Sequence, residues 1–304
     1  MTNLTKRHSI DRRQFFGLGA GVAVVASTGA VLAQANPPSP PAPTVEPGRV
    51  TVERRAGVLL LGIDRPQAQN RMSPEILIGL GKGLYQLEHD QELRVAVIHG
   101  HGRDFCLGVD LPAFAAAQAA GVLPPKDPDY INPLGLRPPF RTKPVVAAVQ
   151  GGTKYAGHEL FLAADIRIAA SDCVFSQGEV ARGIFPGGGA TVRFTREAGW
   201  GEAMRYMLTG EEWGAEEARR MGLAQEVTEP GKQLERAVAI AGKIAANAPL
   251  GVKATLASAH LAIAGEDAAF TALQTEFPKI LQSNDAKEFQ KALREGRQPT
   301  FHGN

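Results

Sequence analysis

Two glutamates in the middle of the chain, Glu159 and Glu179, have the side-chain type and the local setting for proton-transfer chemistry. Glu159 ends the sequence YAGHE (155–159) at the predicted start of a helix, and Glu179 ends FSQGE (175–179) directly after a short predicted strand. Two carboxylates that reach one pocket can share acid and base roles when burial raises the pKa of one of them. A single glutamate is more often a solvated surface residue or a charge at a helix N-terminus, so spacing alone does not decide for catalysis.

The elements that must position these glutamates alternate between strands and helices. Apolar runs predict strands at 58–63, 95–98, 145–149 and 165–169. Ser73 and Pro74 form a helix start, after which apolar residues recur at helical spacing as far as Leu87, and a short helix runs through Leu160. Strands that are separated by helices predict an α/β fold with parallel strand pairing.

The stretch 111–143 and the end of the chain have different patterns. The stretch is rich in alanine and proline and has no strand pattern, which predicts either disorder or a functional loop. Its place just before the glutamates favours a wall of the substrate pocket. After Gly231 only helices are predicted, at about 234–246, 249–263, 267–281 and 286–293. Such a tail is expected to pack on the core or on a neighbouring subunit.

The first 35 residues show the features of an export signal in the expected order. A positive region is followed by a weakly apolar run at 17–32 and by the A-x-A cleavage site Ala33-Gln34-Ala35. The pair Arg12-Arg13, followed by Gln14-Phe15-Phe16, resembles the twin-arginine signal. This predicts recognition by the export machinery and a periplasmic location. A cytoplasmic tail with a chance arginine pair is the alternative, and a permanent membrane anchor is the third option.

A proline-rich segment separates the signal from the expected folded part. Residues 36–48 contain six prolines, which predicts a stiff spacer with nothing to pack. We therefore divide the chain into a signal (1–35), a linker (36–48), a core (49–248) and a C-terminal helical region (249–304). Removal of the signal takes away four positive charges and one negative, so the net charge changes from +2 to −1.

Composition excludes several classes of protein. The 304 residues are 44% hydrophobic and 21% charged, as in an ordinary globular protein. Basic and acidic residues nearly balance, 33 against 31, so a nucleic-acid partner is not expected. Cys106 and Cys173 are too few for a disulfide framework or a cysteine-rich metal site, and no metal site is predicted. A small-molecule enzyme is the class that remains.

Several segments resemble the enoyl-CoA hydratase/isomerase (crotonase) family. RDFCLGVDL (103–111) is similar to its F-C-x-G-x-D-L segment, and KPVVAAVQG (143–151) is similar to its K-P-V-I-A-A-V-N-G strand. FSQGE (175–179) and GIFPGGG (183–189) resemble its F-x-x-P-E and G-x-x-P-G-x-G segments. Weaker similarities lie at 65–70 and 285–299. The resemblance covers about 49–301, and the order of the motifs makes it specific.

The resemblance implies a crotonase-type ββα spiral core with a C-terminal helical oligomerisation region, in a homotrimer or homohexamer. Glu159 and Glu179 match the two glutamates of the hydratases, which hold one water molecule and move its proton and hydroxide across a double bond. The backbone N–H groups of Val109 and Ala156 match the two donors of the oxyanion hole, which binds the enolate. The implied substrate-binding residues are Cys106, Leu107, Gly108, Asp110, Tyr155, Gly157, Pro186 and Gly187.

The sequence also departs from the family pattern. Tyr155-Ala156-Gly157 replaces Gly-Gly-Gly, so the Ala156 methyl group is expected to crowd the acyl carbonyl, and a positive φ there would cost about 1 kcal/mol. Lys154 replaces an apolar residue and Gly178 a proline. His158 takes a small or cysteine position, where we expect it to pack or to support the site rather than act as a base. The basic residue that some members use near the CoA phosphates is missing after Asp110.

The resemblance predicts an enoyl-CoA hydratase-like enzyme that adds water across the double bond of a 2-enoyl thioester. No cofactor is implied beyond coenzyme A, the acyl carrier of the substrate. Because CoA is cytosolic, export would favour the alternatives: a C–C hydrolase or lyase, or an isomerase, that acts on a non-CoA carbonyl compound. A crotonase scaffold without catalysis is the third hypothesis, although such a scaffold has no need to keep both glutamates.

Overall fold

A six-stranded, mostly parallel sheet forms the centre of the protein. The computed structural model describes residues 46–123, 125–264 and 279–304. The strand order is β1-β2-β3-β4-β6-β9. β1 (Arg49–Arg55) pairs antiparallel with β2 (Val58–Asp64), and parallel pairing then joins β2 to β3 (Val95–Gly100), β4 (Val145–Val149), β6 (Ile166–Ala170) and β9 (Glu226–Thr228). The predicted α/β class with parallel pairing is confirmed.

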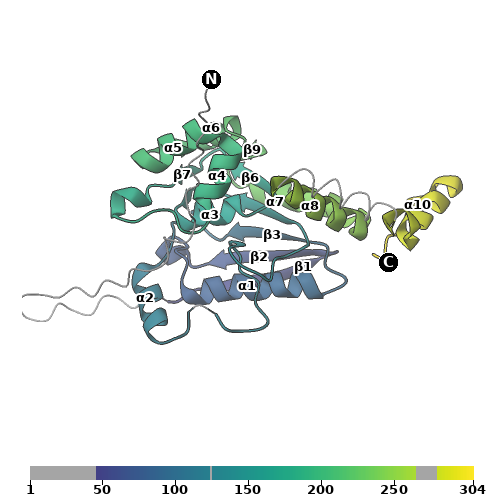
Figure 1. Cartoon of the computed structure of the whole chain (residues 1–304), viewed down its shortest axis with the longest axis horizontal. Helices are drawn as coiled ribbons and strands as arrows, with labels where there is room; N and C mark the ends of the chain where they lie inside the picture. Colours follow the sequence, from purple (N-terminus) through teal and green to yellow (C-terminus); the bar gives the residue numbers. More distant parts are fainter. Residues whose placement is uncertain (1–45, 124, 265–278) are drawn as a thin grey trace, which may run out of the picture. The chain divides into compact units, whose positions relative to one another are not determined.

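Helices cover both faces of this sheet (Figure 1). Alternate strand residues point to opposite faces, and both sets are apolar here, as parallel sheets buried on two sides require. Leu59, Leu61 and Ile98 lie in the core cluster that includes the apolar side of α1 (Pro74–His89). Leu60, Val97 and Val146 lie in the second cluster, with α7 (Gln233–Ala245). The predicted cap of α1 is present, since the Ser73 side chain accepts a hydrogen bond from the Ile76 N–H.

A second, three-stranded sheet holds the segments that carry the two glutamates. β5 (Gly152–Lys154) pairs parallel with β7 (Val174–Ser176), which pairs antiparallel with β8 (Glu212–Gly214). α3 (Ala156–Leu162) follows β5, and the short 3-10 helix η2 (Glu179–Arg182) follows β7. Because β5 and β7 run in the same direction, the segments that follow them leave the sheet at the same edge.

The alanine- and proline-rich stretch differs from the prediction, because part of it is helical. The first part of the alanine- and proline-rich stretch is helix α2 (Leu111–Ala119), capped by the Asp110 side chain, which accepts from the Ala113 N–H. The described residues between this helix and β4 are irregular. The other short elements are η1 (Pro66–Ala68), α4 (Ala190–Ala198), α5 (Trp200–Thr209) and α6 (Ala215–Arg220).

Two C-terminal helices agree with the prediction, α8 (Pro249–Ala264) and α10 (Asn284–Glu295). The helix expected at 267–281 falls mostly outside the described residues, as do the signal at 1–35 and most of the linker. Within the described part of the chain, no helix combines the length and the apolar character that crossing a membrane requires.

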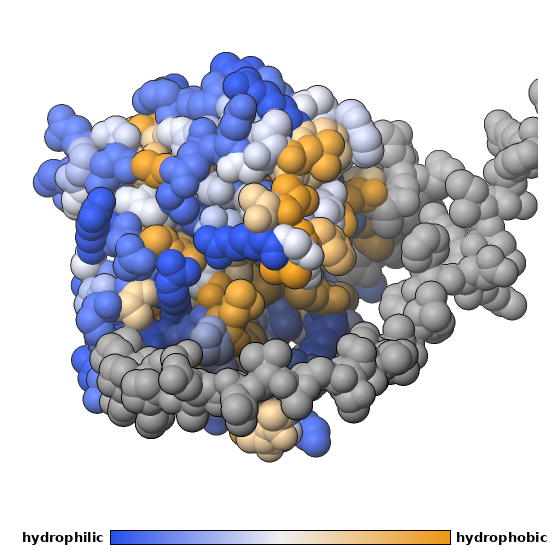
Figure 2. Space-filling view, turned by 90° about the vertical axis from the view of Figure 1, so that its left-hand side faces the viewer, coloured by the Kyte–Doolittle hydropathy of each residue, from blue (hydrophilic) through white to orange (hydrophobic). Residues whose placement is uncertain are grey.

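One face of the protein, on the side of α2, carries apolar side chains between hydrophilic ones (Figure 2). Exposed apolar residues occur on α2 and in the segment that follows η2, where Leu111, Ile184 and Phe185 expose about half of their surface or more. Both segments border the residues that the sequence singles out for chemistry.

Candidate active site

The parallel pairing of β5 and β7 brings Glu159 and Glu179 together. Thr153 pairs with Phe175 and Lys154 with Ser176, so the turns after the two strands start side by side. Both carboxylates are buried, with 3% of Glu159 and 6% of Glu179 exposed. They are close enough for the charge of Glu179 to raise the pKa of Glu159. The surface interpretation of these residues is thus excluded.

Glu159 is held by the backbone of the glycine-rich segment. Its Oε1 accepts hydrogen bonds from the N–H groups of Gly188 (2.6 Å) and Ala190 (3.2 Å). Burial raises the pKa of Glu159 to about 7, although these two hydrogen bonds act in the opposite direction. Gly188 has no room for a side chain, because a Cβ atom there would lie 2.3 Å from Glu159 Oε2.

Glu179, like Glu159, accepts hydrogen bonds from the protein through Oε1. Oε1 accepts a 2.7 Å hydrogen bond from Gln177 Nε2, while the buried Oε2 has no hydrogen-bond partner among the described residues. Burial raises the pKa of Glu179, opposed by a hydrogen bond from its own backbone N–H, by the bond from Gln177 and by the positive charge of Arg182. Each glutamate therefore bonds to the protein through Oε1, and neither Oε2 receives a hydrogen bond from the described residues.

Two backbone segments run side by side where Val109 and Ala156 lie. Cys106 forms a parallel bridge with Thr153, and three residues further along each segment the positions are 109 and 156. Gly108, with φ +88°, approaches so closely that a Cβ atom there would lie 2.9 Å from Tyr155 Cβ. Neither Val109 N–H nor Ala156 N–H has a hydrogen-bond acceptor within the described ranges. Two N–H donors are thus left over on neighbouring segments, one of them at the start of α3, the helix that carries Glu159.

The backbone strain lies at Tyr155 and not at Ala156. Ala156 is the first residue of α3 and has no positive φ, whereas Tyr155 has φ 56° and ψ −125°. The Arg182 guanidinium lies 3.8 Å from the centre of the Tyr155 ring and donates a 2.8 Å hydrogen bond to its hydroxyl oxygen. The cost that a positive φ at Ala156 would carry therefore does not arise, because the unusual conformation belongs to the preceding residue.

The other predicted site residues divide into structural and surface positions. Cys106 is fully buried, and burial raises the pKa of its thiol to about 11. Gly157 packs against the Cys106 carbonyl, where a Cβ atom would lie 2.2 Å from the oxygen. Asp110 caps α2 and forms a 2.8 Å ion pair with Arg65. Of the remaining predicted positions, Leu107 is partly exposed, Pro186 is buried and Gly187 is exposed.

The sequence reasoning overlooked Gln177 and Gly188. Gln177 bonds to Glu179 and to His158, and it lies inside the motif FSQGE, two residues before the glutamate. Gly188 lies inside GIFPGGG, and its N–H is a direct partner of Glu159. Both residues belong to motifs already singled out, but only the fold shows which side chain each one contacts.

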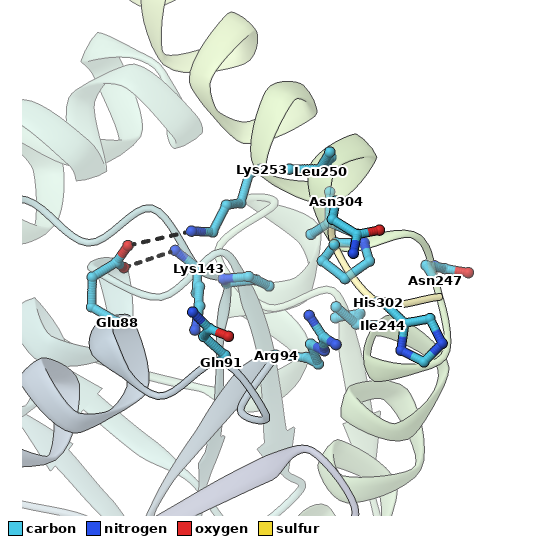
Figure 3. A pocket seen from close by; sticks show the side chains of 14 residues that line it. Glu88, Gln91, Arg94, Lys143, Ile244, Asn247, Leu250, Lys253, His302 and Asn304 are labelled. Atoms are coloured by element: carbon cyan, nitrogen blue, oxygen red, sulfur yellow. Dashed lines mark hydrogen bonds and ion pairs between the residues drawn. The ribbon is translucent and has the colours of Figure 1, made fainter. Parts of the chain in front are cut away.

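Two cavities lie away from these glutamates. One, of about 310 Å³, is bordered by Glu88, Lys143 and Lys253 on one side and by residues 302–304 on the other (Figure 3). Its Lys143 ammonium group donates to the carbonyls of Leu87 and Asp90 and so supports the fold. A second cavity of about 660 Å³ is lined by Arg141, Arg193 and other residues. Neither includes Glu159 or Glu179, and the described residues contain no cluster of three or more possible metal ligands.

The six-stranded sheet, the three-stranded sheet and their helices form a crotonase-type α/β core. The sequence profile of the enoyl-CoA hydratase/isomerase family matches residues 53–304. The chain belongs to this family.

Named relatives and solved structures agree with this assignment. "Enoyl-CoA hydratase EchA19" of Mycobacterium tuberculosis is 35% identical over 269 residues, covering 85% of this chain and 98% of the relative. "Short-chain-enoyl-CoA hydratase" of Clostridium acetobutylicum is 31% identical, covering 83% of this chain and 97% of the relative. The crystal structure of a probable enoyl-CoA hydratase/isomerase from Mycobacterium abscessus is similar with a TM-score of 0.80 at 40% identity, covering 84% of this chain and 98% of that one.

Proposed function

We propose that this protein is an enoyl-CoA hydratase-like enzyme that adds water across the double bond of a 2-enoyl thioester. The observation that carries the proposal is the buried pair Glu159 and Glu179, each with Oε1 bonded to the protein and with no hydrogen bond to Oε2 from the described residues. Relatives named as hydratases, with 30–35% identity over most of the chain, support the same reaction type.

In the proposed mechanism the two Oε2 atoms bind one water molecule. One carboxylate takes a proton from the water, and the oxygen of the resulting hydroxide bonds to C3 of the substrate. The other carboxyl group delivers a proton to C2, so the elements of one water are added and the pair returns to its starting charge. A pKa of about 7 suits Glu159 to this work, because the group can both hold and release a proton near neutral pH.

The N–H groups of Val109 and Ala156 are the proposed oxyanion hole. They would donate to the thioester oxygen as it becomes an enolate, and one such donor in a dry site contributes about 3 kcal/mol to transition-state stabilisation. Two observations support this assignment. The two segments run side by side, and neither N–H has an acceptor within the described ranges. Coenzyme A is the proposed acyl carrier.

The test is hydration of crotonyl-CoA by the purified protein, followed by the loss of absorbance of the conjugated thioester. Wild type should be active and Glu179→Gln nearly inactive, with both proteins equally folded by circular dichroism. Wild type that is folded and does not hydrate any short, long or aromatic 2-enoyl-CoA would overturn the proposal.

A second candidate is C–C bond hydrolysis in a carbonyl compound that is not a CoA ester. It is favoured by Leu111-Pro112-Ala113 after Asp110, where a basic residue for the CoA phosphates is missing, and by the predicted export signal. Cleavage of a free β-diketone by a protein that ignores thioesters would select this candidate.

We also propose export through the twin-arginine pathway and assembly as a homotrimer or homohexamer. The support for export is the order of Arg12-Arg13, the apolar run at 17–32 and the A-x-A site. The exported protein should begin at Asn36, and replacing both arginines with lysine should leave a longer precursor in the cytoplasm. Unchanged delivery of the lysine variant would contradict the twin-arginine interpretation. Sedimentation of the purified protein measures the number of subunits.

A further inference from the structure

Three buried side chains form a continuous hydrogen-bonded chain that ends on the second glutamate. His158 Nδ1 lies 2.5 Å from Gln177 Oε1, and Gln177 Nε2 donates to Glu179 Oε1 at 2.7 Å. His158 and Gln177 are completely buried, with 0% of either residue exposed. His158 lies on α3, beside Glu159, but it contacts the segment of the other glutamate.

The chemistry of the end group fixes the direction of both hydrogen bonds. An ionised carboxylate only accepts, so Gln177 must turn its NH₂ group toward Glu179. Its carbonyl oxygen then faces His158 and needs a donor, and Nδ1 must therefore carry the proton of the neutral imidazole. A single tautomer of His158, with the proton on Nδ1 and a lone pair on Nε2, satisfies the whole chain.

The surroundings of His158 favour the neutral ring. The imidazole packs against Phe161, Phe175, Phe194 and Trp213, with ring centres 5.1–6.1 Å away. Burial lowers the pKa of His158 to about 4. The hydrogen bond to Gln177 acts to raise this pKa, and the positive charge of Arg167 acts to lower it further. Among the described residues, Arg167 is the charged side chain that affects the pKa of His158. Arg182 is the positively charged side chain that affects the pKa of Glu179.

Packing alone does not account for a histidine at this position. Nε2 is buried and has no hydrogen-bond partner in the described part of the protein. A buried polar atom without a partner destabilises the folded state, and an apolar side chain of similar size would avoid that cost. The favourable contribution of the imidazole must come from its other nitrogen, which bonds to Gln177.

We propose that His158 is a positioning residue for Glu179 and acts through Gln177. Its Nδ1–H holds the Gln177 amide in the one orientation that presents NH₂, and not the carbonyl oxygen, to the carboxylate. This fixes Glu179 Oε1, favours the ionised form and leaves Oε2 free to act on water. The role of this contact in hydration rests on the function proposed above.

The test compares two substitutions that differ in one hydrogen-bond donor. His158→Asn keeps an N–H close to the place of Nδ1, while His158→Leu has a similar volume and no donor. His158→Leu should lower kcat for crotonyl-CoA about tenfold, as expected for the loss of one buried hydrogen bond, with KM within about twofold of wild type. Without the fixed NH₂ group the pKa of Glu179 rises, so the acidic limb of the kcat/KM profile should move to higher pH. His158→Asn should restore both quantities.

A second measurement does not depend on activity. In the full-length protein labelled with ¹⁵N-histidine, the NMR signals of His158 should show a protonated Nδ1 and an unprotonated Nε2 that do not titrate between pH 5 and 8. A proton on Nε2, or equal kinetics and pH profiles for wild type and a folded His158→Leu, would overturn the proposal. If His158→Leu does not fold, the tautomer of His158 still decides. An expected tautomer in a protein without hydratase activity would refute the proposed function and leave the hydrogen-bonded chain standing.

Discussion

Replacement of Gly188 by alanine tests whether the glycine-rich segment holds Glu159 in its working position. A methyl group at residue 188 would meet Glu159 Oε2 at 2.3 Å, Cδ at 2.7 Å and Cβ at 3.2 Å, whereas ordinary contact begins at 3.4 Å. The carboxylate must therefore move by about 1.1 Å, the difference between 3.4 and 2.3 Å. The movement also disturbs the 2.6 Å hydrogen bond from the Gly188 N–H.

A displacement of about 1 Å in a reacting group costs roughly 100-fold in rate. We therefore expect Gly188→Ala to lower kcat for crotonyl-CoA about 100-fold. The backbone accepts alanine, because Gly188 has no positive φ. The clash with the buried carboxylate should still lower the free energy of unfolding by about 1–3 kcal/mol, the usual cost of overpacking, while the protein stays folded.

The matched control is Gly201→Ala, the same substitution on α5. A Cβ atom at Gly201 has nothing within 4 Å, so this variant should keep wild-type activity. Steady-state hydration and urea unfolding of all three proteins complete the comparison. Full activity in Gly188→Ala would refute the argument that this segment fixes Glu159.

Three further predictions concern the glutamates and the proposed oxyanion hole. Glu179→Gln should lower kcat about 100- to 10,000-fold with an unchanged circular dichroism spectrum, and near-full activity would remove Glu179 from the mechanism. Because the pKa of Glu159 is raised from 4.5 to about 7, the folded state binds this proton more tightly than the unfolded chain. The free energy of unfolding should therefore fall as the pH rises from about 4.5 to about 7, and Glu159→Gln should flatten that dependence in urea unfolding. Ala156→Gly should keep the N–H donor, lose about 0.5–1 kcal/mol of stability and raise kcat/KM for bulky more than for short enoyl-CoA substrates, while an unchanged ratio would show that the methyl group does not crowd the acyl group.

The central sheet could be predicted because each of its inner strands is buried on both faces. β2, β3 and β4 read as continuous apolar runs, and a run of that kind needs no knowledge of the rest of the fold. β1 was not predicted, since most of its residues are exposed and it belongs to the sheet only through its pairing with β2. β8 and β9 have three residues each, too few for a recognisable period.

The sequence predicts which residues form the candidate site but not how they lie relative to one another. Glu159 and Glu179 are identified from their motifs, but they lie 20 positions apart, a separation that does not predict proximity. The register of β5 with β7 brings the two segments side by side, so that the charge of Glu179 acts on Glu159. The same register accounts for the bond between His158 and Gln177, which are 19 positions apart. Short strands set this geometry, and their pairing depends on the fold around them.

The strained conformation of Tyr155 shows how one part of the site determines another. A non-glycine residue at φ 56° and ψ −125° costs about 1–3 kcal/mol, so other contacts must hold it. The Arg182 guanidinium stacks on its ring and donates to its hydroxyl oxygen. Arg182 ends the 3-10 helix that begins at Glu179, and Tyr155 immediately precedes the proposed donor Ala156. The contact between Arg182 and Tyr155 therefore joins the segment of the second glutamate to the residue that precedes the proposed oxyanion donor.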